Sequence, residues 1–397
     1  MPEKKSILFV DDEREILDGL QLRLRRQRRV WDMTFAHGSD TGIELLENRR
    51  FDVVVTDVQM PGRSGVAVLD TARKHSPSTA RIALSGQVDD LKLLKLTPLA
   101  HRFISKPCPA DKLRETLEAV IGLTERIGNP RILELIGAVD SLPTRPSIHQ
   151  KLVAAVQRID GDAAVLAEIV RQDMGLATKV LQIANSAYFG SQVPVVRLES
   201  AVAHIGVESL AYLSLTLGMF RAFEPSAKLP DLSADDLFRH SLLCAGIARE
   251  IVGSDVDPEN VVNAALVHDC GKLLLACRAE DAYREVLAQA GDRPLEQVER
   301  EVLGVDHADV GGFLLHLWGL PAEVVETVAA HHTPPESCLL SEPQCAIYVA
   351  NRLAHHVVEQ TPDRDLEEFF ANLDLEADRE DLTEIAVRCA ASSETAS

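Results

Sequence analysis

The sequence predicts an α/β domain followed by an all-α domain. In residues 1–122, short apolar runs that are typical of strands alternate with amphipathic stretches that are typical of helices; the runs occupy 7–10, 30–36, 51–55, 81–84 and 102–105. Five such alternations predict a parallel sheet of five strands with helices on both faces. From about residue 130 onward, one helical pattern follows another without strand-like alternation. The second half is therefore expected to be all-helical.

The first predicted helix carries apolar side chains at the spacing of three and four residues, namely Ile16, Leu17, Leu20 and Leu24. It runs into the basic cluster RLRRQRR at residues 23–29. Charge runs of this kind usually lie on a solvated helix face, and that is the interpretation adopted for this cluster.

Helix boundaries in the second half are indicated by capping signals. The pattern over 233–252 opens with Ser233 as an N-cap candidate, and Pro258 is expected in the first turn of the next helix. The junction near 122–130 contains Gly and Pro. We expect four segments: an α/β domain at 1–122, a linker at 123–134, a helical domain at 135–358 and an acidic, partly helical tail at 359–397 whose last eight residues are disordered.

Composition excludes several classes of protein. The apolar runs fall short of the ~20 residues that span a bilayer, and the N-terminus lacks the pattern of a secretory signal. The seven cysteines are scattered without a CxxC pair, which favours a reducing cytoplasm over a disulfide framework. With a formal net charge of −20 and no basic recognition helix, direct DNA binding is not expected.

Polar residues follow four of the five predicted strands. Asp11 and Asp12 follow the first strand, Asp57 the third, Ser85 the fourth and Lys106 the fifth. Because the carboxyl ends of parallel strands form the ligand-binding edge of such sheets, these side chains are expected to converge. Three carboxylates at one point would repel one another unless a hard cation such as Mg²⁺ lay between them.

This pattern resembles the receiver domain of two-component response regulators, over essentially all of residues 5–122, including the stretch VVVTDVQMPG. The resemblance implies a flavodoxin-like fold with Asp57 as the phosphoacceptor. It further implies a Mg²⁺ site and a set of switch residues: Asp11, Asp12, Asp57 and the backbone carbonyl of Gln59 for Mg²⁺, with Lys106, Ser85 and Phe103 contacting or responding to the phosphoryl group. A sensor histidine kinase would be the phosphodonor.

The second half contains histidines on several predicted helices together with one His-Asp pair, in ALVHDCGKLLL. The candidates for a metal site in the helical core are His240, His268, Asp269, His307, His331 and His332. A divalent metal held there could activate water for attack on a phosphoester.

The arrangement resembles the HD superfamily of metal-dependent phosphohydrolases and, more closely, the HDOD domain, an HD-related output domain, over roughly residues 135–358. Besides the His-Asp segment, the resemblance includes QDMGLATKVLQIANSAYFG at 172–190 and the stretch that ends in His331 and His332. Asn351 occupies the position where the hydrolases have a closing Asp ligand. A neutral amide cannot offset the charge of a metal ion, so this departure argues against turnover.

Three interpretations of His268 and Asp269 remain open: a hydrogen-bonded pair in the core, ligands of a metal (Fe, Mn or Zn) without turnover, and part of a phosphodiesterase site. The favoured function is a bacterial-type cytoplasmic response regulator whose HDOD domain signals through contacts with an unidentified downstream protein. The alternative, from another class, is a metal-dependent phosphohydrolase acting on cyclic dinucleotides or nucleotides. The sequence leaves the formation of a homodimer open.

Overall fold

The computed structural model describes residues 4–85 (except 63), 99–139, 163–185, 195–206, 234–252, 258–318 (except 292), 320–334, 339–359 and 379–394, with isolated positions at 151, 152, 155, 210, 229, 232 and 370. The chain forms two compact units. The first is Met1–Ser141 with the short segments Asn185–Val193 and His316–Gly319, and the second contains the rest.

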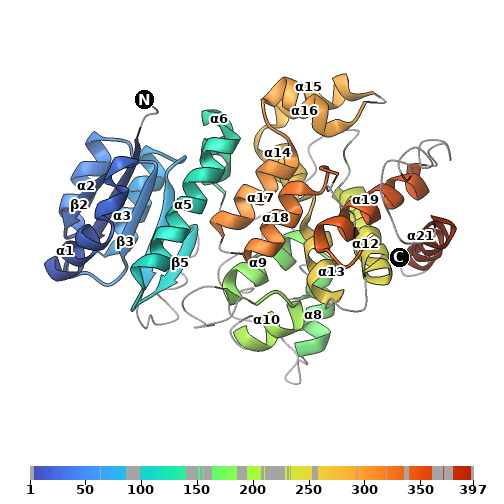
Figure 1. The fold of residues 1–397 in the computed structure, drawn as a ribbon, viewed down its shortest axis with the longest axis horizontal. Helices are drawn as coiled ribbons and strands as arrows, with labels where there is room; N and C mark the ends of the chain where they lie inside the picture. The colour runs from blue at the N-terminus through green and yellow to red at the C-terminus, as the bar shows by residue number, and fades with distance from the viewer. Residues whose placement is uncertain are drawn as a thin grey trace. The chain divides into compact units, whose positions relative to one another are not determined.

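The first unit alternates strands and helices from its first strand to the end of its sheet (Figure 1). Its elements are β1 (Lys5–Asp11), α1 (Arg14–Arg23), the 3₁₀ helix η1 (Arg25–Arg29), β2 (Trp31–His37), α2 (Ser39–Asn48), β3 (Val53–Asp57), α3 (Gly65–His75), β4 (Ala80–Ser85), β5 (Arg102–Ser105), α5 (Ala110–Ile127) and α6 (Pro130–Gly137). All neighbouring strands are parallel, in the order β2-β1-β3-β4-β5. The structure thus confirms the predicted parallel sheet of five strands.

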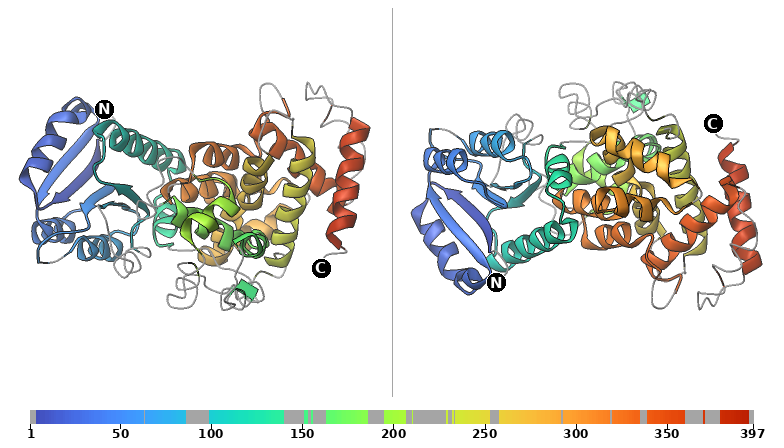
Figure 2. Two further views of the ribbon diagram at one scale, coloured as in Figure 1. Left: turned by 90° about the horizontal axis from the view of Figure 1, so that it is seen from below. Right: turned by 90° about the horizontal axis from the view of Figure 1, so that it is seen from above.

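Both faces of the sheet are covered by helices (Figure 2), and the alternation within β1 shows why. Leu8 and Val10 belong to the core cluster that includes residues of α2 and α3, whereas Ile7 and Phe9 are equally buried on the opposite face. Both faces of a parallel strand must therefore be apolar, which explains the continuous run ILFV in the sequence. In β1 the polar residues lie at the two ends of the strand, Lys5 and Ser6 at its start and Asp11 at its end.

Helix α6 belongs to the first unit and is fixed there by one buried arginine. Arg81 of β4 is only 2% exposed, and its guanidinium donates hydrogen bonds to the backbone carbonyls of Leu99 (2.6 Å) and Gly137 (2.7 Å). A Cβ atom on Gly137 would lie 1.9 Å from the carbonyl oxygen of Pro77, so the helix end abuts the loop that precedes β4. The segment 123–134 therefore contains the end of α5 and the start of α6.

All described elements of the second unit are helices. They are α8 (Ala163–Arg171), α9 (Met174–Ala184), α10 (Leu198–Ile205), α12 (Ala234–Ile251), α13 (Pro258–Val267), α14 (Cys270–Arg278), α15 (Glu280–Ala290), α16 (Leu295–Leu303), α17 (His307–Leu317), α18 (Ala322–Ala330), α19 (Pro343–Glu359) and α21 (Arg379–Glu394). Helix α12 packs against α13, α19 and α21, and α18 packs against α13 and α19. The predicted all-helical character is confirmed, and α13 begins at Pro258 as expected.

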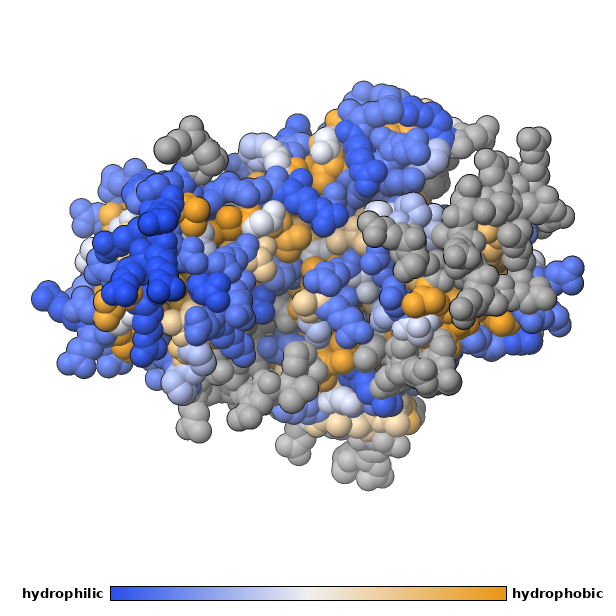
Figure 3. Space-filling model, in the orientation of Figure 1, coloured by the Kyte–Doolittle hydropathy of each residue, from blue (hydrophilic) through white to orange (hydrophobic). Residues whose placement is uncertain are grey.

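Two expectations about this part of the chain need correction. The last eight residues are expected to be disordered, but α21 includes five of them and ends at Glu394, because Leu382 and Ala386 are buried and anchor the helix; residues 395–397 lie outside the described residues. The scattered cysteines favour a reducing cytoplasm over a disulfide framework, yet Cys345 is disulfide-bonded. The first half of the tail that is expected to be partly helical, residues 360–378, lies outside the described residues except for Phe370, which is buried. Among the residues that Figure 3 colours, hydrophilic ones predominate on the face shown.

Candidate functional sites

The acidic residues of the first unit meet at the carboxyl edge of its sheet. Asp11 ends β1 and Asp57 ends β3; both are buried, and a carboxylate oxygen from each lies within 4.8 Å of one from Asp12. Lys106, just beyond β5, bridges the two buried carboxylates, with its Nζ 2.9 Å from Asp11 Oδ2 and 2.8 Å from Asp57 Oδ2. Four of the residues expected to converge do so.

Backbone groups orient the two buried carboxylates. Asp11 Oδ1 accepts a hydrogen bond from the Glu13 amide (2.9 Å), and Asp57 Oδ1 accepts one from the Gln59 amide (3.1 Å). Burial lowers the pKa of Lys106, but its hydrogen bonds to Asp57 and Asp11 outweigh this and raise that pKa above its usual value. The result is a fixed ammonium group beside three carboxylates, a donor set that suits a hard cation with oxygen ligands.

The two remaining switch candidates are placed only by their backbone. Ser85 is the last residue of β4 and pairs with Ser105, while Phe103 of β5 pairs with Ala83. Both therefore lie on strands that reach the same edge as Asp57. Their side chains are outside the described part of the chain, so their roles stay predictions.

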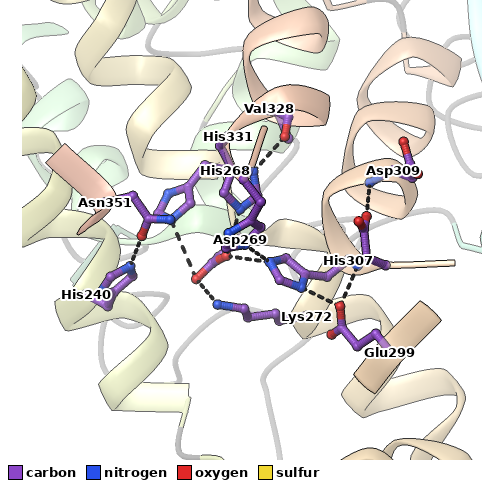
Figure 4. A network of polar contacts seen from close by, with 12 residues as sticks. His240, His268, Asp269, Lys272, Glu299, His307, Asp309, Val328, His331 and Asn351 are labelled. Carbon is purple, nitrogen blue, oxygen red and sulfur yellow. Dashed lines mark hydrogen bonds and ion pairs between the residues drawn. The ribbon is translucent and has the colours of Figure 1, made fainter. Parts of the chain in front are cut away.

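In the second unit, residues from five helices or their ends surround Asp269 (Figure 4). His268 and Asp269 lie between α13 and α14, and the other candidates come from α12, α17, the end of α18 and α19: His240, His307, His331, His332 and Asn351. Ligand atoms of Asp269, His307, His331 and His332 all lie within 4.8 Å of one another, as do those of His240, His268 and Asp269. Sequence reasoning thus selected residues that meet in the fold.

The approach of these elements depends on glycine. A Cβ atom on Gly271, in the first turn of α14, would lie 1.9 Å from the carbonyl oxygen of His307. Only a residue without a side chain permits this contact, and it brings Asp269 and His307 together. The two glycines of the stretch HADVGG have a similar role, because Cβ atoms there would meet Cys270 and Ala329.

Three imidazole rings hold their Nδ1 atoms in the same way. His268 Nδ1 is 2.6 Å from the carbonyl oxygen of Ala265, His331 Nδ1 is 2.6 Å from that of Val328, and His307 Nδ1 is 2.6 Å from Glu299 Oε2. Each partner can only accept, so each Nδ1 carries the proton and each Nε2 faces the cluster. This backing by an acceptor is the usual arrangement of histidines that bind metals.

The imidazole Nε2 atoms and the Asp269 carboxylate oxygens that face the centre of the cluster form few good hydrogen bonds within the protein. The Nε2 atoms of His307, His331 and His268 lie 3.4, 3.6 and 3.6 Å from the Asp269 carboxylate, which is long for a hydrogen bond. Among the described residues, His268 Nε2, His331 Nε2 and Asp269 Oδ1 are buried without a hydrogen-bond partner. Buried acceptors without donors are rare, and a cation would satisfy all three.

Protonation states agree with a cation site. Burial lowers the pKa of His268 to about 3 and also lowers that of His331, so both rings are neutral near pH 7. Burial raises the pKa of Asp269, but Lys272 and His268 outweigh it and hold that pKa well below its usual value. Burial opposes the charge of His307 as well, yet the Glu299 carboxylate raises its pKa to about 9. His307 Nε2 lies 2.8 Å from His332 Nε2, so a metal would replace a shared proton.

Sequence reasoning missed a second layer behind this cluster. Glu299 is fully buried and accepts hydrogen bonds from the backbone amide of His307 (2.8 Å) and the hydroxyl of Tyr283 (2.8 Å). Lys272 donates to Asp269 Oδ2 at 2.8 Å. The contact between Lys272 and Asp269 could have been predicted from the sequence, since Lys272 lies about one helical turn after Asp269. Glu299 was hidden among the other acids of the charged α16.

Asn351, which the resemblance to the hydrolases places at the position of a closing Asp ligand, lies beside His240. Its side chain is buried on α19, and its Oδ1 is 2.8 Å from His240 Nε2. His240 Nε2 is therefore engaged in a hydrogen bond to the amide oxygen of Asn351 and is not available to a metal ion. Near His240 the cluster holds one carboxylate, Asp269, and a neutral amide.

Comparison with protein families matches two consecutive stretches of this chain. The response regulator receiver domain matches residues 7–118, and the HDOD domain matches residues 142–334. Among solved structures, the MmoQ response regulator of Methylococcus capsulatus is 23% identical, with 62% of this chain and 98% of that chain covered and a TM-score of 0.50. A virulence factor of Campylobacter jejuni is 20% identical, with coverage of 65% and 98% and the same TM-score. At these identities the two structures support the fold.

Curated bacterial relatives match parts of the chain. The hydrogenase transcriptional regulatory protein HoxA of Cupriavidus necator is 26% identical over 60% of this chain and 48% of its own length. The uncharacterized transcriptional regulatory protein YkoG of Bacillus subtilis is 31% identical over 30% of this chain and 52% of its own length. The matches thus span about half the length of these relatives. No helix among the described residues is long and apolar enough to cross a membrane.

The receiver match spans the sheet with Asp57 and Lys106, and the HDOD match spans the helices around Asp269. The two matches agree with the fold of each half and with the order of the halves along the chain. The chain is a response regulator that has an N-terminal receiver domain and a C-terminal HDOD domain.

Proposed function

We propose that a sensor histidine kinase phosphorylates Asp57 and that the phosphoryl group controls signalling by the HDOD domain. The observation that carries this proposal is the position of Lys106, whose Nζ is shared between Asp57 and Asp11. Receiver domains generally use Mg²⁺, and Asp11, Asp12, Asp57 and the carbonyl of Gln59 would hold it here and offset the charge of the phosphoryl oxygens.

A phosphoryl group on Asp57 would give Lys106 a stronger anionic partner at the same place. The group adds between one and two negative charges and several strong acceptor oxygens. Lys106 would pair with it, and the hydroxyl of Ser85, at the end of the neighbouring strand, is the expected second contact. Such a change acts on β4 and β5, the strands that carry Ser85 and Phe103.

Phosphorylation of the full-length protein with acetyl phosphate and Mg²⁺, followed by intact-protein mass spectrometry, tests the acceptor. We expect one phosphoryl group on the wild type and on Asp40→Asn, an exposed control, and none on Asp57→Asn. Lys106→Ala should still be folded but show a much weaker conformational response, since its ammonium group would be missing. Phosphorylation of Asp57→Asn at the wild-type level would contradict the assignment.

For the output domain, we propose a signalling role without turnover in which the cluster around Asp269 holds one transition metal ion, Fe, Mn or Zn. Asp269, His307, His331 and His332 would be its ligands, with His268 adjacent; imidazole and carboxylate donors suit all three metals. The metal would join α14, α17 and the end of α18. The amide of Asn351 beside His240 supports a role without turnover.

A second candidate function, a metal-dependent phosphohydrolase, is favoured by the neutral imidazoles and the ionised Asp269 in one buried cluster. A metal held there would supply an activated water for attack on a phosphoester. Cyclic dinucleotides and nucleotides are its candidate substrates.

Metal analysis of the purified full-length protein distinguishes these alternatives. After dialysis, we expect about one equivalent of transition metal in the wild type and in His204→Ala, an exposed histidine outside the cluster, and loss of the metal in Asp269→Ala. A folded wild type without metal would mean that His268 and Asp269 are a core pair. Metal-loaded protein that hydrolyses cyclic dinucleotides would establish the second function.

A further inference from the structure

The basic cluster found in the sequence forms an exposed surface of the receiver unit. Arg23 ends α1, and four further arginines lie in or at the end of η1: Arg25, Arg26, Arg28 and Arg29. All five are exposed, whereas Leu24 between them is 1% exposed and anchors the segment. Gln27 attaches the segment to α5 by a 3.0 Å hydrogen bond to Glu118. The arginines are therefore presented from a fixed backbone.

Beside this segment lies a groove of about 830 Å³. One wall is formed by Leu22–Gln27, and the other by Pro109, Ala110, Asp111 and Arg114 at the start of α5. Leu22 is 63% exposed, and Val30, which follows η1, is 54% exposed. Two exposed apolar side chains thus flank the arginines. We call this surface, residues 22–30 with 109–114, the basic groove.

Several exposed arginines elsewhere in this acidic chain have a carboxylate partner. Arg49 pairs with Asp32, Arg284 with Asp281 and Arg293 with Glu301. No carboxylate among the described residues forms an ion pair with any of the five arginines of the cluster. Five like charges within seven residues repel one another, and an external anion would relieve this repulsion.

Helix α21 has a surface of matching character. Glu380 and Glu384 lie one turn apart on it, with Val387 a further turn along, and Asp381 is adjacent. All four side chains are exposed, and Val387 is 54% exposed. An acidic stripe with one apolar residue is what a basic surface with two apolar residues would bind. The opposite side of α21 is buried through Leu382 and Ala386, so the acidic stripe faces outward.

We propose that the basic groove receives the acidic face of α21 from a second copy of this chain. Charge favours this partner over a polyanion, because residues 1–130 contain 21 Lys and Arg against 19 Asp and Glu, whereas the remainder contains 20 against 42. The negative remainder would repel nucleic acid or an anionic membrane but would attract the groove of another copy. The contact joins different surfaces of the two copies, so association is head-to-tail.

Sedimentation velocity of the full-length protein over a range of concentrations at low and high salt tests this proposal. We expect self-association of the wild type that weakens with salt, because exposed charges are screened. Arg25→Glu/Arg26→Glu and Asp381→Lys/Glu384→Lys should each weaken association by roughly ten-fold or more. Arg49→Glu/Arg50→Glu, a double reversal of exposed arginines in the same unit, should leave association unchanged.

The decisive measurement mixes the two reversed proteins and also combines both reversals in one chain. Opposite charges are then restored across the contact, and we expect association to return toward the wild-type constant. Circular dichroism confirms that each variant is folded. A wild type that stays monomeric at all concentrations, or association unaffected by either reversal, would overturn the proposal. So would failure of the combined reversal to restore association, and so would binding of DNA or anionic vesicles that Arg25→Glu/Arg26→Glu abolishes while self-association persists.

Discussion

His101 and Arg81 form a small buried polar group whose charge state is set by packing. His101 Nδ1 accepts a hydrogen bond from the backbone amide of Arg81 (3.1 Å), and its Nε2 donates to the carbonyl of Gly137 (2.9 Å). The ring is therefore neutral when folded. Burial, and secondly the charge of Arg81, hold the pKa of His101 well below 6.5.

This lowered pKa predicts a loss of stability in acid. The unfolded chain protonates His101 near pH 6.5 and the folded chain does not, so the unfolded state gains a proton as the pH falls. The contribution is complete above pH 6.5 and decreases below it, by up to about 1.4 kcal/mol per pH unit. Denaturant unfolding of wild type and His101→Asn between about pH 7 and 5 measures it. The variant should lose less stability than the wild type; parallel curves would contradict the assignment.

Individual site residues can be predicted from the sequence where the fold alone requires them to lie close together. Asp11, Asp57 and Lys106 could be selected because strand ends meet at one edge, whichever side chains they carry. Glu299 could not, because its value depends on where α16 lies relative to His307, and several other acids share that helix. Arg81 was equally hidden, since an arginine within an apolar strand gives no indication of the carbonyl groups it meets.

The end of helix α6 packs so closely against the loop before β4 that Gly137 cannot carry a side chain. Gly137→Ala would place a methyl group 1.9 Å from the carbonyl oxygen of Pro77, so the helix end must move away from Arg81. We expect a loss of about 2 kcal/mol or more in unfolding free energy. The control is Gly122→Ala in α5, where nothing lies within 4 Å of the added atom and helix propensity should add about 0.5–1 kcal/mol. Denaturant unfolding of both variants checks this, and equal effects would contradict it.

Helices and strands could be told apart from the sequence because the spacing of apolar residues follows from which side chains are buried. The strand at 30–36 was displaced by one residue from β2, and Pro258 marked a helix start correctly. The end of α21 was misjudged because its sequence, CAASSE, is polar and small, whereas burial of Leu382 and Ala386 earlier in the helix holds it in place. Terminal helices depend on packing that composition does not reveal.

For the whole molecule, the change of rhythm near residue 130 predicted an α/β half followed by a helical half, and both fold classes are present in that order. It did not reveal which half the helix after the boundary belongs to, because α6 is amphipathic in either case. The cluster around Asp269 was predictable as a set of residues. Its unpaired nitrogens and its backing carbonyls were not, since both depend on ring orientation in the packed core.

The hydrogen bond from Arg81 to Gly137 bears on any attempt to separate the two halves. A fragment that ends before α6 would leave a buried guanidinium without one of its acceptors and would uncover the loop before β4. A fragment that ends beyond Val139, which is itself 2% exposed, keeps both intact. Helix α6 is therefore part of the folded receiver unit. Because Arg81 joins β4 to the end of α6, a movement of β4 would also move α6.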